Sequence, residues 1–121
     1  MARMLSILVV EDDPAIRRVL ADALGKCYEP RVVETGEEGL RALRESVPDV
    51  ILTDLDLGGF PGERLAAEAL SLSRPPIVFM MSGDAPRLLR AASSAQRTFA
   101  KPFPIKDLLS ALRECAALRL N

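Results

Sequence analysis

The sequence predicts an α/β fold in which a five-stranded parallel sheet lies between two layers of helices. Short apolar runs alternate five times with longer stretches in which apolar residues recur at helical spacing. The clearest runs are continuously apolar, as expected for strands that helices cover on both faces. The chain has 121 residues, 49% of them apolar, which is enough for one domain with a full core. We therefore expect a single domain over residues 1–121, with its core at about 4–118.

The first unit pairs a buried strand with a capped helix. Residues 5–10 (LSILVV) form a continuous apolar run, and Asp13 and Pro14 then supply an N-cap and a first-turn proline. Apolar residues at helical spacing continue from there as far as Cys27. A second short strand is expected at 31–34.

The middle of the chain repeats this pattern. Residues 35–38 (TGEE) have the Ser/Thr-x-x-Glu form of a capping box and open a second helix, which Pro48 ends. A third strand is expected at 49–53 (DVILT). A glycine-bearing loop at 58–62 then leads into a helix at 63–72.

The last two units follow the same order. Residues 77–81 (IVFMM) read as a fourth buried strand, and 84–95 as a shorter, weaker helix. A fifth strand is expected at 97–100. Pro104 opens a final helix whose apolar stripe runs from Ile105 to Ala116.

Composition excludes several classes of chemistry. The chain has no histidine, which removes Ser-His-Asp and Cys-His machinery and histidine-ligated metals. A net charge of −1 gives no basic field for nucleic acid, and no segment approaches the ~20 apolar residues of a membrane span. Cys27 and Cys115 fall on apolar helix positions without CxxC spacing, so we expect buried free thiols in a cytoplasmic protein.

Polar side chains follow four of the five expected strands, at the point where each strand ends. In chain order these are Glu11, Asp12 and Asp13, then Asp54 and Asp56, then Ser82, and last Lys101. Ligands of open parallel sheets bind beyond the carboxyl ends of the strands. We therefore expect these side chains to meet in one site.

The residue types of this site favour phosphoryl chemistry. Carboxylates crowded within ~4 Å repel one another by ~4 kcal/mol per pair at an effective dielectric of ~20, so a cation is expected to visit them. Hard oxygen ligands favour Mg²⁺, which retains waters for a phosphate. A hydroxyl and an ammonium beside it complete a phosphoryl-transfer site. Without histidine or an activated serine, the expected phosphoryl acceptor is a carboxylate.

Four motifs at these strand ends resemble the receiver domain of bacterial two-component response regulators. They are ILVVEDDP at 7–14, DVILTDLDLGGFPG at 49–62, MSG at 81–83 and KPF at 101–103. The resemblance extends from about Met4 to Leu118. It implies a (βα)₅ flavodoxin-like sandwich, in agreement with the pattern above.

The resemblance also implies a role for each site residue. Asp54 matches the phosphoacceptor, and Glu11 and Asp12 match the acidic pair that holds Mg²⁺, Asp12 directly and Glu11 through water. Asp56 matches a position that ligates the metal by its backbone carbonyl. Ser82 and Lys101 match the hydroxyl and the lysine that contact the phosphoryl group, and Lys101-Pro102 is expected to be a cis peptide. Asp13 is not a ligand in the family, and we assign it to the helix N-cap.

Three features depart from the family pattern. Thr98 replaces an aromatic residue that turns inward on activation, and Gly58 replaces a proline. Ser82 and Lys101 lie closer in sequence than usual, with the deficit in the fourth helix. We therefore expect the switch at Ser82 and Thr98 to couple weakly to the usual output surface. Four helix arginines are interpreted as solvated faces: Arg17, Arg18, Arg87 and Arg90.

The resemblance implies a stand-alone receiver that takes a phosphoryl group from a sensor histidine kinase or a histidine phosphotransfer protein onto Asp54. Such a domain catalyses its own phosphorylation and slow dephosphorylation and switches a surface for an unknown downstream protein, without nucleic acid or membrane. One alternative is a degenerate receiver that docks a partner without phosphorylation. The other is a small Mg²⁺-dependent phosphatase of the haloacid-dehalogenase type, because Asp54-Leu55-Asp56 resembles its DxD motif.

Overall fold

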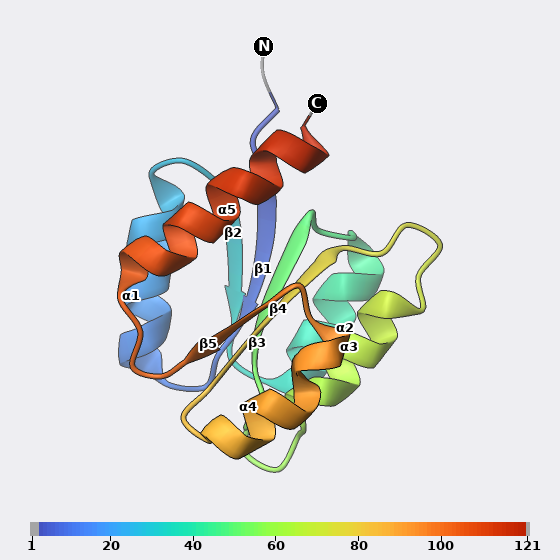
Figure 1. Ribbon diagram of the computed structural model, residues 1–121. Coiled ribbons are helices and arrows are strands. Elements are labelled where there is room, and N and C mark those ends of the chain that lie inside the picture. Colours follow the sequence, from blue (N-terminus) through green and yellow to red (C-terminus); the bar gives the residue numbers. More distant parts are fainter. Residues whose placement is uncertain (1–2, 121) are drawn as a thin grey trace.

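The computed structural model describes residues 3–120, and its five strands form one parallel sheet in the order β2-β1-β3-β4-β5. The strands are β1 (Ser6–Val10), β2 (Glu29–Val33), β3 (Val50–Asp54), β4 (Ile77–Ser82) and β5 (Arg97–Ala100). Every residue of β3 and β4 is buried, as the continuous apolar runs predict. The expected α/β sandwich is confirmed (Figure 1).

Two layers of helices cover the sheet (Figure 1). The helices are α1 (Pro14–Gly25), α2 (Gly36–Glu45), α3 (Gly62–Leu70), α4 (Ala85–Ala91) and α5 (Ile105–Arg119), with a 3₁₀ turn at Ala92–Ser94. One core cluster joins the sheet to α1 and α5, and the other joins it to α2, α3 and α4. Within residues 3–120, no helix has the length and apolar character needed to cross a membrane.

The expected helix caps are present. The carboxylate of Asp13 accepts a hydrogen bond from the backbone N of Ala15 at 2.8 Å. The hydroxyl of Thr35 accepts one from the backbone N of Glu38 at 3.1 Å and donates to the Glu38 carboxylate. Both side chains satisfy amide groups that the first turn of a helix leaves unpaired. The assignment of Asp13 to capping is confirmed.

Two local expectations are wrong. Cys27 is exposed, because α1 ends at Gly25 and the helical spacing does not continue to it, whereas Cys115 is buried as expected. The fourth helix ends at Ala91 instead of residue 95. Gln96 bonds Val78 twice, by its backbone N to the Val78 oxygen and by its side-chain oxygen to the Val78 N, each at 2.8 Å. Residues 92–94 continue only as a 3₁₀ turn, and the Gln96 bonds then draw the chain into the sheet.

Asp49 joins the starts of β1 and β3. Its buried carboxylate accepts hydrogen bonds from the backbone N of Ser6 at 2.9 Å, from the Ser6 hydroxyl at 3.1 Å and from Arg3 at 2.7 Å. Burial alone would raise the pKa of Asp49, but these hydrogen bonds outweigh it and hold the pKa below its ordinary value. The charged form of Asp49 therefore stabilises the fold.

We expect Asp49→Asn to lower the free energy of unfolding at pH 7 by about 1–2 kcal/mol, through weakened hydrogen bonds from Ser6. The pKa of Asp49 is lower in the folded chain than in the unfolded chain, where it is about 4. The charged carboxylate therefore adds to the free energy of unfolding above pH 4, and this gain is lost as the pH falls through the pKa of the folded chain. The gap between wild type and variant should close on acidification. Urea unfolding from pH 7 to pH 3 measures this, with exposed Asp22→Asn as the control; a pH-independent gap would contradict it.

Candidate functional site

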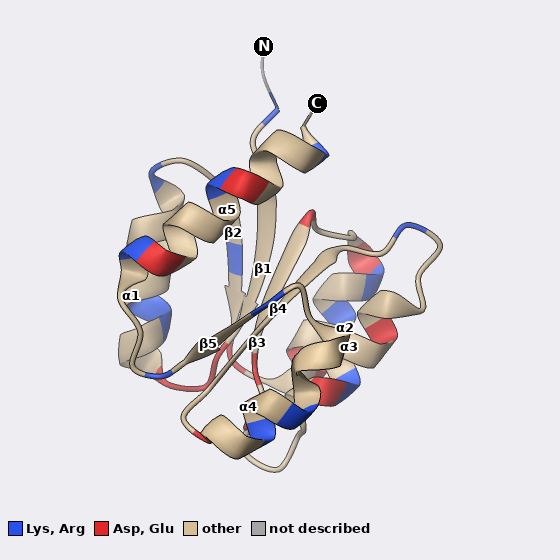
Figure 2. Cartoon of the chain, in the orientation of Figure 1, with Lys and Arg blue, Asp and Glu red and all other residues tan. Residues whose placement is uncertain are grey.

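The carboxyl ends of β1, β3, β4 and β5 surround a pocket of about 370 Å³. All seven polar residues expected at the site line it: Glu11, Asp12, Asp13, Asp54, Asp56, Ser82 and Lys101. Figure 2 shows acidic residues gathered where β1 and β3 end, at the opposite end of the molecule from both termini. The expectation that one edge of the sheet collects these side chains is therefore borne out by their positions.

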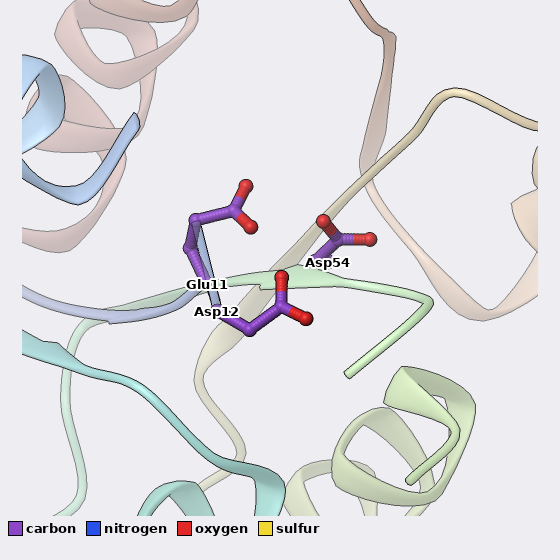
Figure 3. Close-up of side chains that lie close together, drawn as sticks. All are labelled: Glu11, Asp12 and Asp54. Atoms are coloured by element: carbon purple, nitrogen blue, oxygen red, sulfur yellow. The ribbon is translucent and has the colours of Figure 1, made fainter. Parts of the chain in front are cut away.

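Three carboxylates form the centre of the site (Figure 3). Glu11 is 0% exposed and Asp54 is 5% exposed, whereas Asp12 lies at the surface. One oxygen from each lies within 4.8 Å of the other two. Such a cluster repels itself unless a cation is present, because like charges at this spacing interact unfavourably even in a high dielectric.

Lys101 supplies one such cation. Its ammonium donates to Glu11 Oε1 and to Asp54 Oδ2. Its backbone N donates to the backbone carbonyl oxygen of Ser82 at 2.8 Å. Burial would lower the pKa of Lys101, but the hydrogen bonds to the two carboxylates outweigh it and raise that pKa. Burial, reinforced by the Asp54 charge, raises the pKa of Glu11 to about 7. The peptide bond from Lys101 to Pro102 is cis, as the resemblance implies.

The loop between β3 and α3 fixes the backbone around Asp54. The backbone N of Asp56 donates to Asp54 Oδ1 at 2.9 Å, while the Asp56 side chain is exposed. Gly58 has a φ of 64°, a conformation that proline cannot adopt and glycine adopts without strain. A Cβ on Gly62 would lie 2.0 Å from the backbone carbonyl oxygen of Asp54. The start of α3 is therefore packed directly against the end of β3.

Ser82 is buried beside the site, but its hydroxyl is turned to its own loop. Ser82 Oγ accepts a hydrogen bond from the backbone N of Asp84 at 3.0 Å. Thr98 is exposed on β5, opposite Met80 in the register. Position 98 therefore carries no aromatic ring, as the sequence indicates.

Two arginines that the sequence assigns to solvated helix faces instead contact the site loops. Arg17 donates to the backbone carbonyl oxygen of Glu11 at 3.0 Å and to that of Asp12 at 2.8 Å. Arg87 lines the pocket, donates to the Leu55 oxygen and pairs with Glu63. Arg18 and Arg90 are exposed, as expected. The contact of Arg17 could be inferred from its closeness in sequence to Glu11 and Asp12. Nothing near Arg87 in the sequence indicates that it contacts Leu55 and Glu63.

The donor set fits a hard divalent cation. The candidate ligands are carboxylate and backbone oxygens, which Mg²⁺ prefers, and no nitrogen or sulfur ligand is among them. The Asp12 carboxylate has no hydrogen bond or ion pair within residues 3–120, so it can bind a cation without first losing a partner. The residues that line the pocket can therefore hold a metal beside Asp54.

Comparison with known proteins identifies relatives over nearly the whole chain. The family model for the response regulator receiver domain matches residues 7–113. The DNA-binding response regulator MtrA of Mycolicibacterium smegmatis is 35% identical over 118 residues, 95% of this chain and 51% of that protein. The positive alginate biosynthesis regulatory protein of Pseudomonas aeruginosa is 31% identical over 117 residues, 93% of this chain and 47% of that protein. The chain thus spans about half the length of these curated relatives.

A solved response regulator structure also matches nearly the whole chain. The response regulator protein TrrA from Thermotoga maritima, in complex with Mg²⁺ and BeF, superposes with a TM-score of 0.82 at 25% identity. The match covers 93% of this chain and 99% of that one.

Proposed function

The chain belongs to the response regulator receiver domain family, and we propose that it accepts a phosphoryl group on the carboxylate of Asp54 from a phosphohistidine of a partner protein. As a receiver domain it is part of a two-component system. The observation that carries the proposal is the placement of Asp54: buried at the end of β3, in contact with Lys101, and beside the unpaired carboxylate of Asp12.

The transfer exchanges one bond for another at phosphorus. An oxygen of Asp54 attacks, the P–N bond to the partner's imidazole breaks, and the imidazole leaves with the electron pair and gains a proton from solvent. Lys101 offsets the negative charge that the added phosphoryl group brings to this edge of the sheet. Ser82 then donates a hydrogen bond to a phosphoryl oxygen.

Three residues besides Asp54 are proposed to hold Mg²⁺. Asp12 binds it directly, Glu11 through water and Asp56 by its backbone carbonyl. The metal supplies positive charge that lets an anionic carboxylate and an anionic phosphoryl group approach each other. The same site supports slow loss of the phosphoryl group to water.

Residues 1–121 form one receiver domain, which acts in the cytoplasm and, once phosphorylated, changes its affinity for a downstream protein. Incubation with a small phosphodonor and Mg²⁺ tests the proposal. One stable phosphoryl group per chain supports it, turnover of a phosphate ester would favour a phosphatase of the haloacid-dehalogenase type, and neither outcome would favour a docking module that acts without phosphorylation.

A groove beside Lys101 is proposed to receive the histidine-bearing partner. It has a volume of about 400 Å³ and mostly apolar walls: Ala15, Ile16, Val19, Leu20, Lys101, Pro102, Phe103 and Ile105. Val19 is 56% exposed although it lies on the helix face that the apolar pattern assigns to the core. A partner seated there would have its phosphohistidine close to Lys101 and hence to Asp54.

We expect Val19→Glu to slow phosphoryl transfer from a phosphorylated histidine-kinase domain by about tenfold, because a charge replaces an apolar contact in the interface. Labelling by the small donor acetyl phosphate should be unchanged, since that donor needs no groove. Leu118→Glu is the control, because Leu118 is 77% exposed on α5 outside this groove. The measurement is the rate of phosphoryl transfer to each variant from the kinase domain and from acetyl phosphate. Equal slowing with both donors would contradict docking at this groove.

A further inference from the structure

Arg87 connects the first turn of α4 to the segment that follows Asp54. Its guanidinium donates a forked pair of hydrogen bonds to Glu63, Nε to Oε2 at 2.9 Å and Nη2 to Oε1 at 2.8 Å. Nη2 also donates to the carbonyl oxygen of Leu55 at 2.6 Å. Only 26% of the Arg87 side chain is exposed, and the hydrogen bond from Arg87 lowers the pKa of Glu63. The pair therefore stays charged at neutral pH and holds α4 against α3 in one geometry.

The same turn of α4 is joined to Ser82. Asp84 caps α4, its carboxylate accepting from the backbone N of Arg87 at 3.0 Å, and its own backbone N donates to Ser82 Oγ. No hydrogen bond joins Ser82 to Asp54 in the part of the chain that the structure describes. A continuous set of contacts thus runs from Ser82 through Asp84 and Arg87 to Leu55, the neighbour of Asp54.

We propose that Arg87 is a positioning residue that holds Ser82 in its own loop and so opposes the closure of that hydroxyl on a phosphorylated Asp54. The inference rests on the proposed phosphorylation of Asp54. In the proposed closure the turn formed by Ser82, Gly83 and Asp84 shifts toward Asp54, carrying a hydroxyl that accepts from the Asp84 N and still has a proton to donate. The pair between Arg87 and Glu63 fixes the helix that begins at this turn. Breaking the pair therefore favours the closed arrangement and any ligand that requires it.

Two variants break the pair with opposite changes of charge. Arg87→Met removes a positive charge, and Glu63→Gln removes a negative one. We expect each to bind beryllofluoride, an anionic phosphoryl analogue, about fivefold more tightly in the presence of Mg²⁺, the change that ~1 kcal/mol gives. Charge alone would make Arg87→Met bind the anion more weakly, so tighter binding by both variants is specific to release of the turn. Arg87→Lys keeps the positive charge but cannot make the paired hydrogen bonds to Glu63, so its affinity for beryllofluoride should lie between those of wild type and Arg87→Met.

Isothermal titration calorimetry of wild type and the three variants, with thermal melting of each, tests the proposal. Unchanged affinity with a lower melting temperature would assign Arg87 a purely structural role, and opposite shifts in the two variants would assign it a charge effect; either overturns the inference. Binding by wild type and none by Asp54→Asn keeps the proposed function independent of that result. Absence of binding to wild type would overturn both proposals.

Discussion

Replacing Asp54 by asparagine is expected to reduce phosphoryl labelling from a small donor and Mg²⁺ to background. The amide is not nucleophilic and cannot form an acyl phosphate, whereas its size and its carbonyl oxygen are retained. That oxygen can still accept the hydrogen bond from the backbone N of Asp56, and Lys101 keeps its contact with Glu11. The variant should therefore fold, which thermal melting can verify, while intact-protein mass spectrometry measures the labelling.

Asp56→Asn is the matched control. Asp56 lies two residues further on, and its exposed side chain has no hydrogen bond or ion pair within the described residues. Its proposed contribution is the backbone carbonyl, which the substitution leaves in place. Labelling of Asp56→Asn should reach one phosphoryl group per chain, as in wild type. If Asp54→Asn remains labelled, another carboxylate, such as the exposed Asp12, is the acceptor.

Features set by neighbours in the sequence could be predicted from it. The buried strands follow from continuous apolar runs, and the starts of α1 and α2 follow from Asp13 and Thr35, whose caps span two or three residues. The meeting of the polar strand ends also follows from sequence, because parallel strands bring their carboxyl ends to one edge. The sheet therefore places Asp54 beside Glu11, although 43 positions separate them.

Features set by distant contacts could not be predicted. An arginine in the first turn of a helix is usually solvated, and only the packing of α4 against α3 brings Arg87 to Glu63, 24 positions away. The end of α4 depends in the same way on bonds between Gln96 and Val78 in the sheet. Cys27 fits a helical period that the chain leaves two residues earlier, at Gly25. For Arg87 and for the end of α4, the local pattern is compatible with two structures and a tertiary contact selects one. At Cys27 the ending is local, because the Leu24 carbonyl oxygen accepts from the backbone N of both Cys27 and Tyr28.

Magnesium is expected to stabilise the folded chain through Asp12. A metal that binds only the folded form at ~10 mM, with a dissociation constant of order 1 mM, raises the free energy of unfolding by ~1.4 kcal/mol. Asp12→Ala should remove most of this gain, because it deletes the one carboxylate of the three that has no partner in residues 3–120. Urea unfolding with magnesium chloride, and with sodium chloride at equal ionic strength, measures the difference.

Without the metal, Asp12→Ala should be at least as stable as wild type. Lys101 contacts Glu11 and Asp54, so the negative charge of Asp12 is left without a cation in a cluster whose oxygens lie within 4.8 Å. Asp12 is exposed, which keeps its repulsion near the water value of ~1 kcal/mol rather than the larger value of an interior pair. Its backbone oxygen, which accepts from Arg17, is unchanged by the substitution.

The neighbouring acid provides a control with the opposite outcome. Asp13 caps α1 and holds no metal in the proposed site, so Asp13→Ala should lose about 1 kcal/mol of stability, a typical N-cap loss, and retain the full response to Mg²⁺. Two adjacent aspartates then separate metal binding from folding: the first substitution removes the magnesium response without loss of stability, and the second does the reverse. An unchanged magnesium response in Asp12→Ala would place the metal elsewhere, and a lost response in Asp13→Ala would show that α1 itself shapes the metal site.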